Sequence, residues 1–113
     1  MEKIFINTHK KVVIVDVNEI NYLDALGAYT IVCLTKSRNI KVSKNILTFT
    51  KMLTSENFIR TNRHNTINLL NITEITKEKD KAIVHFDNKS KLEISKKLYS
   101  KLLGHIEDFY KAK

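Results

Sequence analysis

The chain has 113 residues, enough for one domain with one hydrophobic core, and 42% of them are hydrophobic and 28% charged, so we expect a folded rather than a disordered chain. Lys and Arg number 20 against 12 Asp and Glu, and this excess favours a polyanionic partner, with nucleic acid as the first candidate. The lack of proline and the presence of only two glycines argue against collagen-like chains, flexible linkers and glycine-rich phosphate loops.

The first part of the chain is predicted to be mainly β, because short runs rich in Ile, Val, Thr, Phe and Tyr follow one another. The run at 11–17 is almost continuously apolar, which is typical of a strand buried on both faces. In the run at 18–25, we expect Ile20, Tyr22 and Asp24 to lie on one side. The predicted strands are 4–6, 11–17, 18–25, 29–34 and 39–42, and the last two form a hairpin across residues 35–38.

The periodicity changes after residue 43. Apolar side chains then recur at helical spacing, and Ser43 precedes them as a candidate N-cap, so we predict a helix over residues 44–55. The strand pattern returns at residue 58, and Asn88 suits the turn of a final hairpin across residues 87–90. The predicted strands of this part are 58–60, 67–69, 72–76, 82–86 and 91–94.

The chain ends in a second predicted helix, for which Ser95 is a candidate N-cap. One stripe of this helix is apolar and is formed by Leu98, Leu102, Ile106 and Phe109. The sequence therefore predicts a single, mainly β domain over residues 1–113, with one internal helix and one C-terminal helix.

Motifs for catalysis or metal binding are lacking. The four histidines are scattered, without the i, i+4 pair that zinc would use on a helix. The single cysteine, Cys33, excludes a disulfide within the chain, and its apolar surroundings predict a small core residue. Asp24 is expected to be partly buried beside a structural cation such as Arg60. We predict no catalytic residue, no metal site, no cofactor and no small-molecule substrate.

The sequence also predicts no membrane partner. No apolar run approaches the ~20 residues that a membrane helix needs. Residues 1–4 lack the apolar core of a signal peptide, so we expect a cytoplasmic protein. The length is also that of one domain of a longer protein.

The most unusual segment is Arg60–Thr66, which places two Arg, two Asn and one His between predicted strands. Arg can bind phosphate or read guanine, and Asn pairs with adenine, so these side chains suit DNA. An ordinary solvated loop explains the composition equally well. The pair Lys96–Lys97 opens the last predicted helix, where backbone N–H groups favour phosphate, although a solvated helix end is as simple an explanation.

Three separated motifs fall in one register along the chain. They are Ile20-x-Tyr22-Leu23-Asp24-Ala25-x-Gly27-x-Tyr29-Thr30, Phe58-x-Arg60-x-x-Arg63-x-x-x-Ile67-Asn68-Leu69-x-x-Ile72 and Leu92-x-Ile94-Ser95-Lys96-Lys97. Their order and spacing, with a predicted helix between the first two, resemble the LytTR family of bacterial DNA-binding domains over about residues 12–103. The resemblance implies an elongated arrangement of small antiparallel sheets. It also implies sequence-specific binding of duplex DNA in transcriptional regulation, as the output domain of a response regulator in a two-component system or as a stand-alone regulator.

Members of this family bind paired direct repeats in promoters, so the resemblance also implies a possible homodimer on DNA. It assigns base reading to the loops at 27–30 and 62–64 and to Lys96, with Lys97 beside it. Arg60 would contact phosphate or brace the second loop, and Asn68 would satisfy backbone groups of the following turn. The DNA-binding residues that the resemblance implies are Ala28, Tyr29, Thr30, Arg60, Asn62, Arg63, His64, Lys96 and Lys97.

Two other functions compete with this hypothesis. A protein-interaction module on the same fold, without DNA binding, would show little salt dependence in its complex. RNA readers of the β type expose aromatic side chains on a sheet, whereas aromatic residues are only 8% of this chain and most are expected to be buried.

Overall fold

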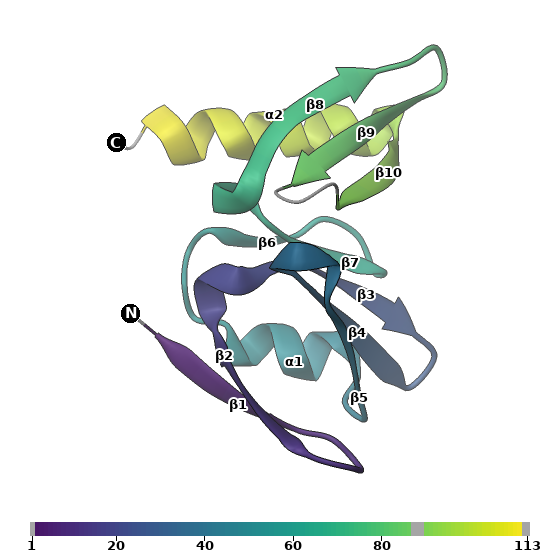
Figure 1. Ribbon diagram of the computed structural model, residues 1–113. Helices are drawn as coiled ribbons and strands as arrows, with labels where there is room; N and C mark the ends of the chain where they lie inside the picture. Colours follow the sequence, from purple (N-terminus) through teal and green to yellow (C-terminus); the bar gives the residue numbers. More distant parts are fainter. Residues whose placement is uncertain (1, 87–89, 112–113) are drawn as a thin grey trace.

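The computed structural model describes residues 2–86 and 90–111. These residues form three antiparallel sheets, of two, five and three strands, together with two α-helices (Figure 1). The molecule is elongated, with principal extents of 42, 31 and 25 Å. The predicted mainly β fold with one internal and one C-terminal helix is confirmed, whereas the predicted turn at Asn88 lies outside the described residues.

The bounds of the elements follow the predicted order of strands and helices. The strands are β1 (Lys3–Asn7), β2 (Val12–Asp16), β3 (Ile20–Leu26), β4 (Tyr29–Leu34), β5 (Asn39–Val42), β6 (Phe58–Arg60), β7 (Asn65–Asn68), β8 (Ile72–Lys77), β9 (Lys81–Phe86) and β10 (Lys91–Ser95). The α-helices are α1 (Ile46–Met52) and α2 (Lys96–Lys111), and three short 3-10 turns are η1 (Val17–Glu19), η2 (Thr35–Ser37) and η3 (Leu69–Asn71).

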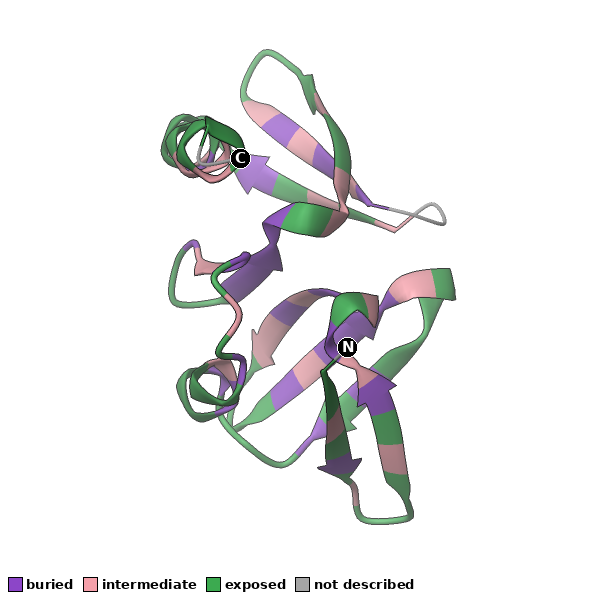
Figure 2. Cartoon of the chain, turned by 90° about the vertical axis from the view of Figure 1, so that its left-hand side faces the viewer, coloured by how far each residue is buried: buried purple, intermediate pink, exposed green. Residues whose placement is uncertain are grey.

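The β1–β2 hairpin packs on the rest of the molecule through one face only. Ile6 and Val15 are buried on that face, whereas Phe5, Val12 and Ile14 are each more than half exposed on the other. The hairpin lies at the lower end of the molecule in Figure 1, and Figure 2 shows its strands as mostly exposed or intermediate. The predicted burial of β2 on both faces is therefore wrong, because the two-stranded ribbon is covered on a single side.

The central sheet has the strand order β5-β4-β3-β7-β6, so β3 is hydrogen-bonded on both edges. Its register with β4 shifts between Ile20 and Tyr22, which makes Asn21 the extra residue of a β-bulge. The bulge reverses the alternation of side chains. Ile20 therefore packs in one hydrophobic cluster with Leu23, while Tyr22 packs against the other, and the prediction that Ile20 shares a side with Tyr22 and Asp24 is wrong.

Helix α1 is shorter than predicted and begins later. Its N-cap is Asn45 rather than Ser43, because the Asn45 side-chain oxygen accepts a hydrogen bond of 2.8 Å from the backbone N–H of Thr48. Ile46 and Phe49 face the sheet and are buried in the larger cluster. The helix therefore covers one face of the central sheet.

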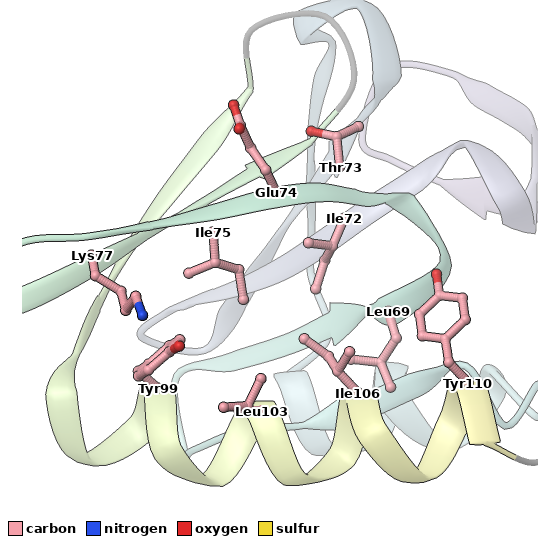
Figure 3. Close-up of a pocket in the computed structure, with 10 residues that line it drawn as sticks. All are labelled: Leu69, Ile72, Thr73, Glu74, Ile75, Lys77, Tyr99, Leu103, Ile106 and Tyr110. Atoms are coloured by element: carbon pink, nitrogen blue, oxygen red, sulfur yellow. The ribbon is translucent and has the colours of Figure 1, made fainter.

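Helix α2 and the sheet β8-β9-β10 enclose the second cluster. The predicted N-cap is confirmed, since the Ser95 hydroxyl accepts a hydrogen bond of 3.1 Å from the backbone N–H of Leu98. Leu102 is fully buried, and the rest of the predicted apolar stripe packs against the cluster. Between β8 and α2 runs an open groove of about 530 Å³, in which Ile72 and Ile75 face Leu103 and Ile106 (Figure 3).

Asn68 clamps the segment after β7 to β3. Its side-chain nitrogen donates to the Ile20 carbonyl at 2.9 Å, and its side-chain oxygen accepts from the Asn57 amide at 2.6 Å. The same oxygen accepts from the backbone N–H of Leu70 at 3.0 Å, which confirms the predicted structural role of Asn68 in the following turn. Because Asn68 is fully buried, water cannot replace these partners.

Asn68→Ala is expected to lower the free energy of unfolding by about 3 kcal/mol, because it deprives the Asn57 amide and the Leu70 backbone N–H of their acceptor and removes a donor from the Ile20 carbonyl. Urea denaturation at equilibrium measures this. Asn39→Ala is the matched control, since Asn39 is exposed in β5, and it should change stability by less than about 0.5 kcal/mol. An Asn68→Ala variant as stable as the control would contradict the clamp.

Candidate nucleic-acid interface

Two of the predicted loops lie side by side where β3 ends and β7 begins. We call this side of the central sheet the edge. β3 ends and β7 begins at this edge, because the two strands are antiparallel neighbours. The backbone N–H of Ala25 donates to the carbonyl of His64 at 2.8 Å, which joins the end of β3 to the β6–β7 loop. The β3–β4 turn at Gly27 and the loop at 61–64 therefore project together (Figure 1).

The β3–β4 turn is tight and places its predicted residues differently. Gly27 has a φ of +60°, a conformation that side chains disfavour, and Ala28 is exposed beside it. Tyr29 is 42% exposed, and the Lys41 ammonium lies 4.3 Å from the centre of its ring. Thr30 is fully buried and its hydroxyl donates to the Lys44 carbonyl at 2.7 Å. The predicted contact of Thr30 with DNA is thus corrected to a positioning role.

The β6–β7 loop is held by its own side chains. The side-chain oxygen of Asn62 accepts from the backbone N–H groups of His64 and Asn65, both at 2.8 Å. The hydroxyl of the buried Thr61 donates to the Asn65 carbonyl at 3.2 Å. Asn62, Arg63 and His64 are all exposed, but the side-chain oxygen of Asn62 accepts hydrogen bonds within the loop.

Arg60 braces this loop from β6. Its Nε donates to the carbonyl of Asn62 at 3.2 Å, and one terminal nitrogen donates to the carbonyl of Arg63 at 3.1 Å. Of the two roles predicted for Arg60, bracing is the one that these hydrogen bonds describe. The predicted pairing of Arg60 with Asp24 is wrong, because the half-buried Asp24 carboxylate accepts instead from the Asn65 side chain at 3.2 Å.

The start of α2 opens on the same side of the molecule as the two loops (Figure 1). Lys96 and Lys97 are both exposed there. Lys96 also borders a groove of about 290 Å³ with Lys77 and Lys81. Two of the three predicted segments thus come from the central sheet and the third comes from the start of α2, and the fold brings them to one side.

The structure adds two cations that the sequence analysis missed. Lys41 lies one residue before the Val42 that pairs with Thr30, and the hydrogen bond from Thr30 holds the backbone of Lys44 at the same edge. The sequence contained a signal for these two lysines, because the predicted hairpin of residues 29–34 with residues 39–42 already placed their segment beside the loop at 27–30. Residues 26–30, 39–45, 60–66 and 95–101 contain no Asp or Glu, so the segments around this edge carry only positive charge.

Comparison with known proteins points to one family. A family model described as the LytTr DNA-binding domain matches residues 10–107. The fold is similar to a solved structure described as the LytTr DNA-binding domain of a methyl-accepting/DNA response regulator from Bacillus cereus. The TM-score is 0.75 at 19% identity, over 94% of this chain and 97% of that one. No curated protein matches the sequence.

Burial favours the neutral forms of the Cys33 thiol and the Tyr22 phenol. Burial raises the pKa of the Cys33 thiol to about 11, and burial together with the neighbouring thiol raises the pKa of Tyr22. No group of three or more His, Cys, Asp or Glu that could hold a metal occurs in residues 2–86 and 90–111. Within the same residues, neither helix is long and apolar enough to cross a membrane.

Cys33 is therefore expected to resist thiol reagents in the folded protein, because burial keeps it protonated and inaccessible at pH 8. Titration with Ellman's reagent should detect no thiol under native conditions and one thiol in urea. Rapid native modification at pH 8 would show that the strand opens or that the thiol is ionised.

Proposed function

The chain belongs to the LytTR family of DNA-binding domains, and we propose that it binds specific sequences of duplex DNA to regulate transcription. The observation that carries this proposal is a single edge at which donor-rich loops free of acidic residues gather. Turns at a sheet edge are narrow enough to enter a major groove about 12 Å wide. Positive charge around them supplies affinity for the phosphate backbone.

The side chains at the edge suggest different roles in DNA binding. Arg63 and His64 are exposed donors of the β6–β7 loop and would read base edges, because a guanidinium can bond both acceptors of guanine. Arg60 and Asn62 fix the backbone of the loop through the hydrogen bonds described above, and this reduces the entropy lost on binding. The small side chain of Ala28 would let the β3–β4 turn approach the groove closely.

Lysines at the start of α2 would act mainly on phosphates. An ammonium is a point charge without the two-pronged geometry of arginine, so base reading by Lys96 would be less selective than by Arg63. Lys97 lies beside it, and both are the first residues of helix α2, whose first N–H groups favour an anion.

The molecule is long enough to contact more than one major groove of DNA. Its longest extent is 42 Å, whereas successive major grooves of B-DNA are separated by ~34 Å on one side of the duplex. We propose that the central sheet and the start of α2 address successive major grooves. Two copies would then occupy paired direct repeats in a promoter and meet as a homodimer on DNA. The chain would serve as a response-regulator output domain or as a stand-alone regulator.

Selection of binders from random duplexes, followed by a salt titration on the selected site, tests the function. A preferred sequence should emerge, and the logarithm of the binding constant should fall against that of salt with a slope of about −4 to −6, for ~4–7 phosphate contacts. A flat salt response, together with a defined complex with another protein in gel filtration, would favour a protein-interaction module instead.

Arg63→Ala should weaken binding to the selected site by about 1–3 kcal/mol and relax the preference at one base position. Lys97→Ala should weaken binding to all sequences equally, because it removes a phosphate contact. Arg38→Ala is the matched control, since Arg38 is exposed at the opposite end of β4. Titrations on duplexes carrying single base changes distinguish these outcomes, and uniform weakening by Arg63→Ala would reassign Arg63 to phosphate.

A further inference from the structure

A second basic surface lies beyond the loops that carry the family motifs. It is a groove of about 620 Å³ between the β1–β2 turn and β5, and Tyr29 forms part of its wall. We call it the hairpin groove. Its lining residues are Thr8, His9, Lys10, Lys11, Tyr29, Asn39, Ile40, Lys41 and Ser43.

The lining of the hairpin groove is positively charged. Lys10, Lys11 and Lys41 line it, and none of its lining residues is acidic. The ion pairs formed among residues 2–86 and 90–111 all involve Lys81, far along the chain in β9. Like charges held together in this way repel one another, so an anion bound among them would be stabilised.

The cations are presented by fixed backbone rather than by a loose loop. The Thr8 hydroxyl accepts from the N–H groups of Lys10 and Lys11 at 3.3 and 3.1 Å and donates to the Lys11 carbonyl at 3.0 Å. The backbone N–H of Thr8 also donates to this carbonyl at 2.8 Å. On the opposite wall, the contact with the Tyr29 ring holds Lys41. This order reduces the entropy cost of binding a ligand.

Tyr29 connects the hairpin groove to the edge at which the motif loops gather. It follows the β3–β4 turn and at the same time lines the groove. In Figure 1 the β1–β2 turn lies on the same side as the β3–β4 turn, the β6–β7 loop and the start of α2. The groove therefore extends this edge toward the lower end of the molecule, at the far end from α2.

We propose that the hairpin groove binds phosphates of the DNA backbone next to the bases read by the loops. The proposal rests on the proposed function of the domain and adds Lys10 and Lys11 to its DNA-contacting residues. Lysine ammonium groups neutralise phosphates without selecting bases, so the groove contributes affinity and salt dependence but no sequence preference.

The test compares Lys10→Ala/Lys11→Ala with the wild-type chain on the selected duplex. If each lysine neutralises one phosphate, the salt slope should become less steep by about 1.8, and affinity at 0.15 M salt should fall roughly 30-fold, since each contact contributes about 0.9 to the slope. The selected sequence should not change. A Lys10→Gln/Lys11→Gln variant with the same thermal unfolding as wild type guards against loss of the turn.

The matched control is Lys51→Ala/Lys111→Ala. It removes the same charge from two exposed lysines near the ends of α1 and α2, on the side of the molecule away from the edge (Figure 1). This control should retain the wild-type slope within about 0.5.

Three results would overturn the proposal and are distinguishable. If the wild type binds its selected site and Lys10→Ala/Lys11→Ala keeps the same slope and affinity as the control, the hairpin groove does not contact DNA while the proposed function stands. A changed base preference would likewise exclude a backbone contact. If the wild type selects no sequence and binds no duplex, the proposed function and the inference fall together.

Discussion

The structure depends on the pairing of β3 with strands on both of its edges, reinforced by buried asparagines. Asn65 and Asn68 lie on β7 and reach across to the carbonyls of Leu23 and Ile20, at 3.1 and 2.9 Å. These side chains bond backbone atoms of β3 in addition to the strand ladder, so β7 cannot slip along β3 without leaving buried polar groups unpaired. The relative position of the β3–β4 turn and the β6–β7 loop follows directly from this fixed register.

The bulge at Asn21 lets one strand serve two hydrophobic clusters. Ile20 and Leu23 pack with α1 and the β1–β2 hairpin, whereas Tyr22 stacks on Phe86 of β9, with ring centres 5.3 Å apart. Because both clusters share β3, the sheet that carries α2 is tied to the sheet that carries the loops. An interface assembled from two sheets can then keep a constant spacing, as recognition of successive grooves would require.

Rigid presentation of charge recurs along the exposed edge. Asn62 and Arg60 fix the β6–β7 loop, and Thr8 fixes the β1–β2 turn, in each case by hydrogen bonds between a side chain and the backbone. A solvated surface needs no such order, and holding like charges close together costs free energy. Both features are expected of a surface that is preorganised for a polyanion, which repays the repulsion when it binds.

The sequence alone determined the order of strands and helices, since period 2 and period 3.6 in hydrophobicity are local properties, and it also identified Ser95 as a local cap. The role of Asn68 in the following turn was implied by the family resemblance. The motif register also indicated the family. Contacts between distant segments decided the rest. The bulge at Asn21, the exposed face of β2, the burial of Thr30 and the partner of Asp24 depend on which strands become neighbours. The hairpin groove joins residues 8–11 to residues 39–43, and no periodicity within either segment could have placed them together, because only the packing of the β1–β2 hairpin on the central sheet brings these charges to one groove.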